Sequence, residues 1–213
     1  MTILENFRKI QNDVSKINKN VTIISVSKTF KLRDISPLIQ LGHLHFGENK
    51  VQETKDKWSG LIESNFSLKL HMIGKLQSNK AYDAIKLFSY IHSLDNEKLA
   101  FKLATYEKEL SKKLKYFIQV NLSEETQKSG IQVKDLSNFI KYCKLDNQLD
   151  VIGLMCLPPV GLDPTNFFSK LNDLAKQSNL QELSMGMSGD YKIAIENGST
   201  FIRLGSVIFG KRS

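Results

Sequence analysis

The sequence predicts a single (β/α)₈ barrel of the α/β class, with one extra helix before the first strand. Eight short apolar segments recur along the chain, and stretches with helical periodicity separate them. Eight such units within 213 residues favour a compact closed barrel over an open sheet. The length also suits one domain, residues 1–213, with enough chain to bury a full core.

The eight predicted strands are short and rich in β-branched or aromatic residues, which favours strands over pieces of buried helix. They cover residues 21–26, 44–47, 69–74, 90–93, 116–121, 150–155, 182–185 and 200–204. Strands that alternate with helices pair in parallel through right-handed crossovers.

Helical periodicity is clearest in three of the intervening stretches. Residues 95–110 carry apolar side chains at spacings of three and four, and residues 164–178 repeat the pattern, with Pro164 suited to a first helical turn. Residues 3–19 form an amphipathic helix before the first strand, without the apolar core of a signal peptide.

Composition excludes several classes of protein. No run of about 18 apolar residues occurs, so we expect no membrane span. Cys143 and Cys156 fit neither a disulfide framework nor a metal site, which predicts reduced, partly buried thiols and a cytoplasmic location. The net charge is +8, but 26 lysines against four arginines, interleaved with acids, indicate a solvated surface rather than a nucleic-acid site.

Lys28 directly follows the first apolar strand. In a barrel, function gathers where the strands end and the next loops begin. A lysine there is partly removed from water, which lowers its pKa and leaves a neutral amine able to form a Schiff base. We therefore select Lys28 over the many surface lysines.

The loops that follow the last two predicted strands contain glycine and serine. Ser188 lies in a glycine-rich loop before a helix predicted at residues 191–197, and Gly205 and Ser206 follow the final strand. In many barrels these two loops bind a phosphate together. The alternative for the first loop is an ordinary helix cap formed by Ser188 or Asp190.

Arg203 interrupts an apolar strand, and a buried arginine needs a partner. We expect it to face a substrate carboxylate or the ring nitrogen of a cofactor. The alternative is an ion pair with a buried acid such as Glu48. Asn49 and Asn121 follow two other strands and either bond a ligand or cap loops.

All four histidines (His43, His45, His71 and His92) fall on predicted strands or at their ends, and His43 and His45 share a face by the period of two. Their spacing matches no metal pattern, so we expect filling or hydrogen bonding inside the barrel and no metal site.

Taken together, these residues resemble the pyridoxal phosphate homeostasis protein family, single-domain relatives of the alanine racemase N-terminal barrel. The resemblance covers nearly the whole chain. The matching stretches are residues 26–29 (VSKT), 46–53 (FGENKVQE), 71–80 (HMIGKLQSNK), 119–121 (QVN), 128–131 (KSGI), 153–155 (GLM), 183–190 (LSMGMSGD), 198–200 (GST), 203–206 (RLGS) and 209–210 (FG).

The resemblance implies a site for pyridoxal 5′-phosphate (PLP). It implies that Lys28 carries the Schiff base and that Arg203 faces the pyridine nitrogen. The other implied cofactor-binding residues are Asn49 near the ring, Met185 and Met155 lining the pocket, and Ser188, Gly205 and Ser206 at the phosphate. The sequence departs from the family pattern at Lys50, Lys75, Gly189 and Ser206, where the hydroxyl is kept.

The resemblance further implies a PLP carrier or regulator, acting in PLP and amino-acid homeostasis, rather than an enzyme with robust turnover. Alanine racemases use a second base from a further domain, and we expect none here because the chain ends at Ser213, after the eighth unit. PLP-dependent apoenzymes are the expected partners, and a monomer is the expected state. The alternatives are a racemase or decarboxylase that acts with Lys28 alone, and a barrel that binds another phosphorylated metabolite.

Overall fold

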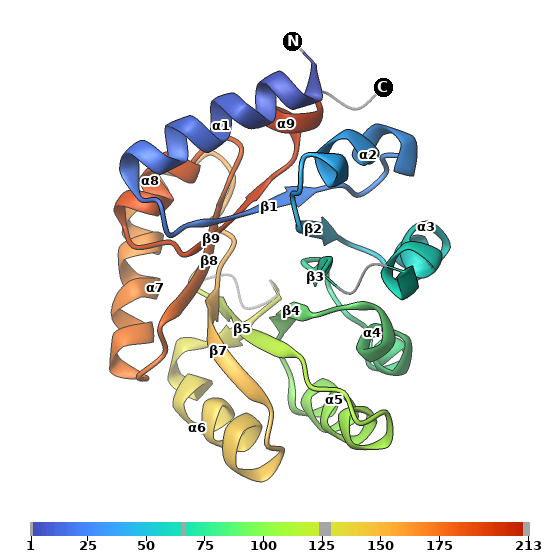
Figure 1. Ribbon diagram of the computed structural model, residues 1–213. Helices are drawn as coiled ribbons and strands as arrows, with labels where there is room; N and C mark the ends of the chain where they lie inside the picture. Colours follow the sequence, from blue (N-terminus) through green and yellow to red (C-terminus); the bar gives the residue numbers. More distant parts are fainter. Residues whose placement is uncertain (1, 65–66, 124–128, 211–213) are drawn as a thin grey trace.

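The computed structural model describes residues 2–64, 67–123 and 129–210 and confirms the predicted barrel (Figure 1). Eight parallel strands follow one another in the order β4-β3-β2-β1-β9-β8-β7-β5, and pairing of β5 with β4 closes the ring. These strands are β1 (Thr22–Val26), β2 (His45–Glu48), β3 (Lys69–Met72), β4 (Tyr90–Leu94), β5 (Lys115–Asn121), β7 (Asp150–Met155), β8 (Glu182–Met187) and β9 (Phe201–Leu204). A two-residue strand, β6 (Ile131–Gln132), adds to the end of β5.

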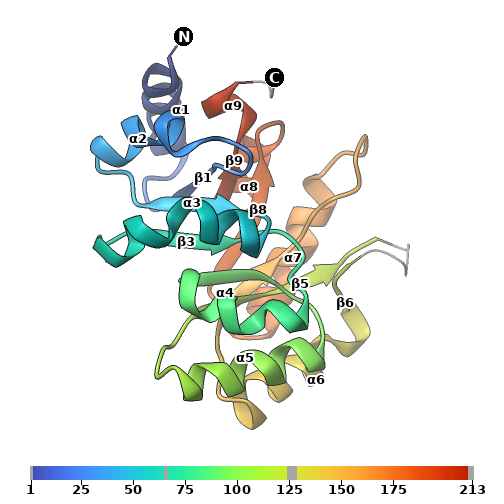
Figure 2. The same ribbon diagram turned by 90° about the vertical axis from the view of Figure 1, so that its right-hand side faces the viewer.

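Helices surround the strands on the outside of the ring (Figures 1 and 2). They are α1 (Ile3–Ile17), α2 (Leu32–Gln40), α3 (Val51–Ser64), α4 (Ala81–Leu87), α5 (Glu97–Glu109), α6 (Leu136–Lys141), α7 (Thr165–Gln177), α8 (Tyr191–Glu196) and α9 (Ser206–Phe209). Short 3₁₀ turns at Ser78–Lys80 and Val133–Asp135 and a π-helical turn at Tyr142–Asp146 complete the elements.

The extra helix α1 forms where the sequence predicts it. Thr2 caps it by accepting a hydrogen bond from the Glu5 backbone, and the Glu5 carboxylate bonds back to Thr2. Phe7, Ile10 and Val14 form its buried stripe, at the spacing of one helical face. α1 lies along α8 and α9, so the first and last helices lie together on this side of the barrel (Figure 1).

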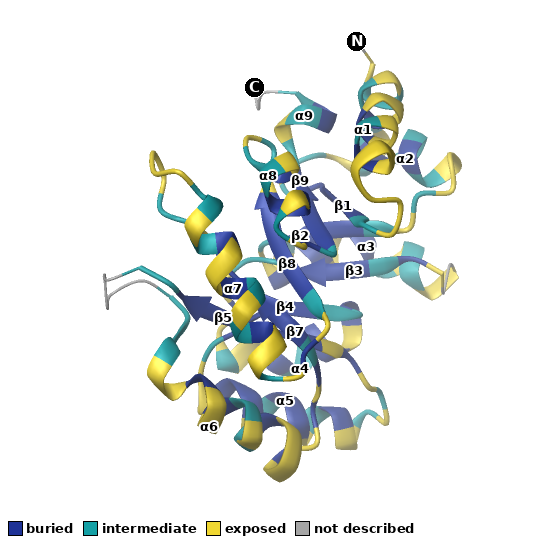
Figure 3. Cartoon of the chain, turned by 90° about the vertical axis from the view of Figure 1, so that its left-hand side faces the viewer, coloured by how far each residue is buried: buried dark blue, intermediate teal, exposed yellow. Residues whose placement is uncertain are grey.

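The core has two layers, and burial is concentrated on the strands (Figure 3). The outer layer lies between strands and helices and is apolar, with Trp58 and Phe168 fully buried in it. The apolar part of the inner layer is small and comprises Ile24, Phe117, Met155 and Phe201. The rest of the barrel interior is polar, which matters for the site.

In the described part of the chain, no helix is long and apolar enough to cross a membrane. Both cysteines are free and buried, as predicted. Burial raises the pKa of each thiol to about 12, so both remain protonated at neutral pH.

Candidate functional site

Six of the seven residues predicted for the site line one cavity of about 430 Å³, at the C-terminal ends of β1, β8 and β9. They are Lys28, Asn49, Ser188, Arg203, Gly205 and Ser206. The residues come from four different loops or strands, so the barrel brings together what the sequence separates. The volume lies within the range typical of sites for small molecules and cofactors.

Met185 does not belong to this lining, which corrects the expectation for it. Its side chain is fully buried in the outer layer of the core, because neighbouring residues of a strand face opposite sides and Ser184 faces the interior. Met187 lines the cavity in its place. Met155 does not line the cavity either and belongs to the inner apolar layer.

Lys28 is half-buried at the cavity wall, and the backbone on both sides of it is tied to α3. Ser27 donates its hydroxyl hydrogen to Oε1 of Glu48 over 2.7 Å, and its carbonyl accepts from Nζ of Lys57 over 2.8 Å. The N–H of Thr29 donates to a carboxylate oxygen of Glu53. These bonds fix where the side chain of Lys28 begins.

A buried ion pair supports these contacts. Nζ of Lys57 lies 2.9 Å from Oε1 of Glu48 and 3.3 Å from Oε1 of Glu53. The indole of Trp58 donates to the same Glu48 oxygen over 3.0 Å. Oε2 of Glu48 is the only buried side-chain oxygen or nitrogen without a hydrogen-bond partner among the described residues. The buried negative charge of Glu48 therefore depends heavily on the positive charge of Lys57 for its stabilisation.

Thr29 adopts a left-handed backbone conformation, with φ at 69°. This region is costly for a β-branched residue and persists only where surrounding contacts hold it. The carboxylate of Glu53 supplies such a contact. Strain next to Lys28 is consistent with a functional loop.

The loops after β8 and β9 meet as predicted. The N–H of Gly205 donates to the hydroxyl oxygen of Ser188 over 3.3 Å. Asp190 is the N-cap residue directly before the six-residue helix α8, and its carboxylate accepts from the N–H of Met187 over 2.6 Å. An anion site at this edge therefore depends on the two hydroxyls and the loop N–H groups rather than on α8.

Arg203 is 4% exposed, and its guanidinium donates hydrogen bonds to neutral oxygens. Nη1 donates to the carbonyl and hydroxyl oxygens of Ser184 over 2.6 and 2.7 Å, and Nη2 donates to the carbonyl of Cys156 over 3.0 Å. The alternative of an ion pair with Glu48 is wrong, because Glu48 pairs with Lys57. Burial lowers the pKa of Arg203 from its usual value, but a guanidinium keeps its proton in proteins, so a buried cation lines the cavity.

Asn49 reaches the cavity because Gly74 lets the two loops touch. A Cβ on Gly74 would overlap the backbone carbonyl oxygen of Asn49 and lie 2.8 Å from its Cα. Asn49, Ile73 and Leu157 also line a neighbouring cavity of about 360 Å³ that contains Lys75 and Asn121. The barrel mouth is therefore one depression with two lobes.

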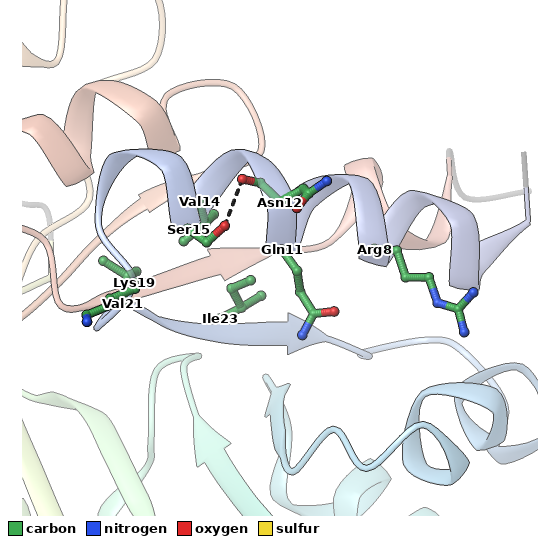
Figure 4. Close-up of a pocket in the computed structure, with 8 residues that line it drawn as sticks. All are labelled: Arg8, Gln11, Asn12, Val14, Ser15, Lys19, Val21 and Ile23. Atoms are coloured by element: carbon green, nitrogen blue, oxygen red, sulfur yellow. Dashed lines mark hydrogen bonds between the residues drawn. The ribbon is translucent and has the colours of Figure 1, made fainter.

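A further cavity of about 500 Å³ lies between α1 and β1 (Figure 4), and it shares no lining residue with the two lobes at the barrel mouth. Arg8, Gln11 and Ser15 of α1 and Ile23 of β1 line it. It does not adjoin the C-terminal strand ends, and it holds no acid, histidine or cysteine. We do not assign it a function.

The histidines confirm one expectation and correct another. His45, His71 and His92 form hydrogen bonds inside the barrel, as predicted, and their partners are one another. His43 does not share their face, because it precedes β2 and its ring packs 4.6 Å from Phe7 of α1. Within the described residues, no three or more histidine, cysteine, aspartate or glutamate side chains are placed so that they could hold a metal ion.

Comparison with known proteins agrees with this geometry. The family described as alanine racemase, N-terminal domain, matches residues 2–213. The pyridoxal phosphate homeostasis protein of Synechocystis is 37% identical over 93% of this chain and 95% of its own length. The protein of the same name from Pasteurella multocida is 34% identical over 100% and 98%.

The chain belongs to the pyridoxal phosphate homeostasis protein family.

The structure of this chain superposes on solved structures with the same barrel fold. PipY of Synechococcus elongatus, solved with PLP bound, is 34% identical and superposes with a TM-score of 0.88, covering 98% of this chain and all of its own. An alanine racemase of Clostridium difficile superposes with a TM-score of 0.75 at 16% identity, covering 98% of this chain and 57% of its own. The second likeness concerns the fold alone.

Several residues that shape the site escape prediction from the sequence. Glu48, Glu53 and Lys57 lie in stretches that read as an ordinary strand end and helix, although two of them fall within a stretch that resembles the family. Ser184 falls within another such stretch, but as a single residue it shows only a polar side chain between apolar ones. Of the residues that depart from the family pattern, Gly189 lines the cavity of about 430 Å³ and Lys75 lines the neighbouring one of about 360 Å³. Lys50 is exposed. Lys128 lies outside the described residues.

Proposed function

We propose that this protein binds PLP in the cavity at the barrel mouth, as a Schiff base on Lys28, and acts in PLP homeostasis. The observation that carries the proposal is the meeting of one half-buried lysine with two glycine and serine loops around the same cavity of about 430 Å³. The relatives named for PLP homeostasis and the PLP-bound structure of PipY support it.

The groups around the cavity fit PLP in kind and in number. An amine suits the aldehyde, while the Ser188 and Ser206 hydroxyls and the Gly205 backbone suit a phosphate. Arg203 suits the pyridine nitrogen, which accepts a hydrogen bond. Asn49 lines both lobes, and its amide suits contact with the ring.

PLP supplies an aldehyde that condenses with amines and a ring that can withdraw electrons from them. Arg203 limits the second property, because a cation beside the pyridine nitrogen disfavours its protonation. Ser27 and Thr29, tied to α3, hold the start of the Lys28 side chain. The site is thus suited to holding the aldehyde more than to stabilising a carbanion.

From these properties we infer a carrier or regulator of PLP in the cytoplasm, with PLP-dependent apoenzymes as partners and a monomer as its working state. Arg203 favours this over a decarboxylase, because it limits electron withdrawal by the ring, whereas alanine racemases share such an arginine and differ from a carrier in their chemistry. The competing enzyme would exchange the α-hydrogen of a free amino acid with solvent.

Absorbance titration tests PLP binding. Wild-type protein titrated with PLP is expected to develop the visible band of a Schiff base, and Lys28→Ala is expected to lack it. Lys50→Ala, which removes an exposed lysine near the same loops, is the matched control and is expected to keep the band. A band of equal intensity in Lys28→Ala would refute the assignment.

Deuterium exchange tests the role. We expect PLP-loaded protein in D₂O to leave the α-hydrogen of free alanine, lysine and arginine in place on the timescale of ordinary enzyme turnover. Rapid, Lys28-dependent exchange would replace the carrier with an enzyme.

A further inference from the structure

Three histidine rings form a hydrogen-bonded series through the inside of the barrel, which we call the imidazole chain. His45, His71 and His92 come from the neighbouring strands β2, β3 and β4. Nδ1 of His45 lies 2.9 Å from Nε2 of His71, and Nδ1 of His71 lies 2.9 Å from Nε2 of His92. His71 and His92 are fully buried, and His45 is half-buried.

The imidazole chain connects to Arg203 through one serine. Nδ1 of His92 lies 2.8 Å from Oγ of Ser184. Nη1 of Arg203 donates to the same oxygen over 2.7 Å. The series therefore runs from the half-buried end of β2, across the barrel interior, to the guanidinium at the floor of the PLP cavity.

Arg203 sets the direction of every hydrogen bond in the series. A guanidinium only donates, so Ser184 accepts from it, and the serine's own hydrogen is then satisfied by donation to Nδ1 of His92. His92 must carry its hydrogen on Nε2 and donate to His71, which donates to His45 in the same way. All three rings are thereby fixed as the Nε2–H tautomer.

The surroundings keep the rings neutral and in place. Burial lowers the pKa of His71 and His92 well below 6.5, and the nearby Arg203 lowers that of His92 further. A protonated ring would donate from both nitrogens and oppose the direction. His71 stacks on Tyr90 and His92 on Phe117, each with ring centroids 4.3 Å apart, so neither ring turns freely.

The series does not supply protons to the cofactor, because it ends at an arginine that already holds all its hydrogens. Its effect is on orientation. We infer that Ser184, His92 and His71 are positioning residues, which hold the guanidinium of Arg203 in one orientation toward the PLP ring nitrogen. The last step rests on the proposed function, whereas the direction of the imidazole chain does not.

Nitrogen NMR of cofactor-free, ¹⁵N-histidine-labelled protein tests the direction. We expect His45, His71 and His92 to be neutral with the hydrogen on Nε2. His43 is an internal reference, since its Nε2 lies 2.8 Å from the carbonyl oxygen of His45 and is held as Nε2–H independently of Arg203. A hydrogen on Nδ1 of any ring of the imidazole chain would overturn the inference.

Two variants of Ser184 test whether Arg203, acting through this serine, sets the direction of the hydrogen bonds in the imidazole chain. Ser184→Asp places a pure acceptor beside His92, so all three rings are expected to switch to the Nδ1–H tautomer while His43 stays unchanged. In Ser184→Ala, which removes the directing hydroxyl, we expect a mixed population at His92. Rings that stay Nε2–H in whichever variant folds would overturn the inference, because the direction would then not come from Arg203.

PLP affinity tests the positioning role. Ser184→Ala is expected to raise the PLP dissociation constant about fivefold, as for the loss of one hydrogen bond to the guanidinium. Ser184→Thr keeps the hydroxyl and is expected to restore affinity. Ser25→Ala, at a buried serine bonded to His43 instead, is the control and is expected to bind normally. Equal affinity in Ser184→Ala would overturn the role, whereas failure of the wild type to bind PLP would refute only the proposed function.

Discussion

At the scale of single residues, the cavity depends on two backbone positions, Thr29 and Gly74. Thr29 holds a left-handed conformation directly after Lys28, with its N–H bonded to Glu53. Gly74 leaves no room for a side chain, because the backbone of Asn49 lies against its Cα. Both positions aim a predicted site residue into the cavity.

Gly74→Ala is expected to displace Asn49 and to lower both PLP affinity and stability. The added Cβ meets backbone atoms, which cannot move aside as a flexible side chain does, and overpacking of this kind costs about 1–3 kcal/mol. Urea unfolding and PLP titration measure the two effects.

The control for this change is Gly60→Ala. Gly60 lies within α3, with no atom near its hypothetical Cβ, so alanine there is expected to stabilise by about 0.5–1 kcal/mol. If Gly74→Ala matched this control in stability and PLP affinity, the close approach to Asn49 would not matter.

Lys28 and Arg203 were predictable as single residues because each is a cation that follows or interrupts an apolar strand. Met185 was misplaced for a related reason. The interior of this barrel is polar at Ser184 and Arg203, and its outer face is apolar, so an apolar side chain in β8 points away from the cavity. Composition of one strand does not reveal which face turns inward.

At the scale of elements, α3 acts as the support of the Lys28 loop. Lys57 reaches from this helix to the carbonyl of Ser27 and to the carboxylates of Glu48 and Glu53. Its side chain is 9% exposed, and that of Glu48 is fully buried. The helix therefore does more than cover the sheet, because it ties the end of β1 to the end of β2.

Lys57→Met is expected to destabilise the protein by about 3–5 kcal/mol, since it leaves the Glu48 carboxylate buried without its cation. The double variant Glu48→Gln with Lys57→Met removes both charges and is expected to recover much of this loss. Urea unfolding measures both. PLP affinity is expected to stay reduced in the double variant, because Ser27 has lost its bond from Lys57.

Lys55→Met is the control on the same helix. Lys55 pairs with Asp83 at the surface over 3.6 Å, so its loss is expected to change stability by less than about 1 kcal/mol. A similar effect of the two lysine variants would contradict the special role of the buried pair.

The elements themselves were largely predictable, because short β-branched runs alternate with helical periodicity. All eight barrel strands occur where predicted, and α5 and α7 lie within one or two residues of their predicted bounds. Pro164 precedes α7 as its cap instead of entering the first turn. The two-residue β6 and the π-helical turn after α6 are too short to leave a periodic pattern in the sequence.

At the scale of the whole molecule, the barrel interior contains neutral imidazoles where many barrels have branched aliphatic side chains. Burial lowers the pKa of His45, His71 and His92, and it lowers that of His43, outside the barrel, to about 4. The sequence predicts that the histidines fill the barrel or form hydrogen bonds inside it. It did not reveal their order, which depends on the register of three strands.

These shifts predict loss of stability in acid. The unfolded chain takes up protons on its histidines near pH 6.5, whereas the folded protein does not, so the unfolded state binds more protons below that pH. The free energy of unfolding is therefore expected to fall as the pH drops from about 6.5 toward 4. Each buried histidine contributes up to about 1.4 kcal/mol per pH unit.

Urea unfolding at a series of pH values measures this dependence. In the variant His71→Phe, which keeps the stack on Tyr90 but removes one titrating ring, the slope is expected to be shallower. Stability that stays level or rises between pH 6.5 and 4 would contradict the neutral, buried state of the rings.

The most direct test of the whole account is to find the atom to which PLP is joined. Protein loaded with PLP is reduced with borohydride, digested and analysed by mass spectrometry. The account predicts that the reduced pyridoxyl phosphate is carried by the peptide containing Lys28, at Nζ of that residue. Attachment at another lysine, or spread over many surface lysines, would contradict it.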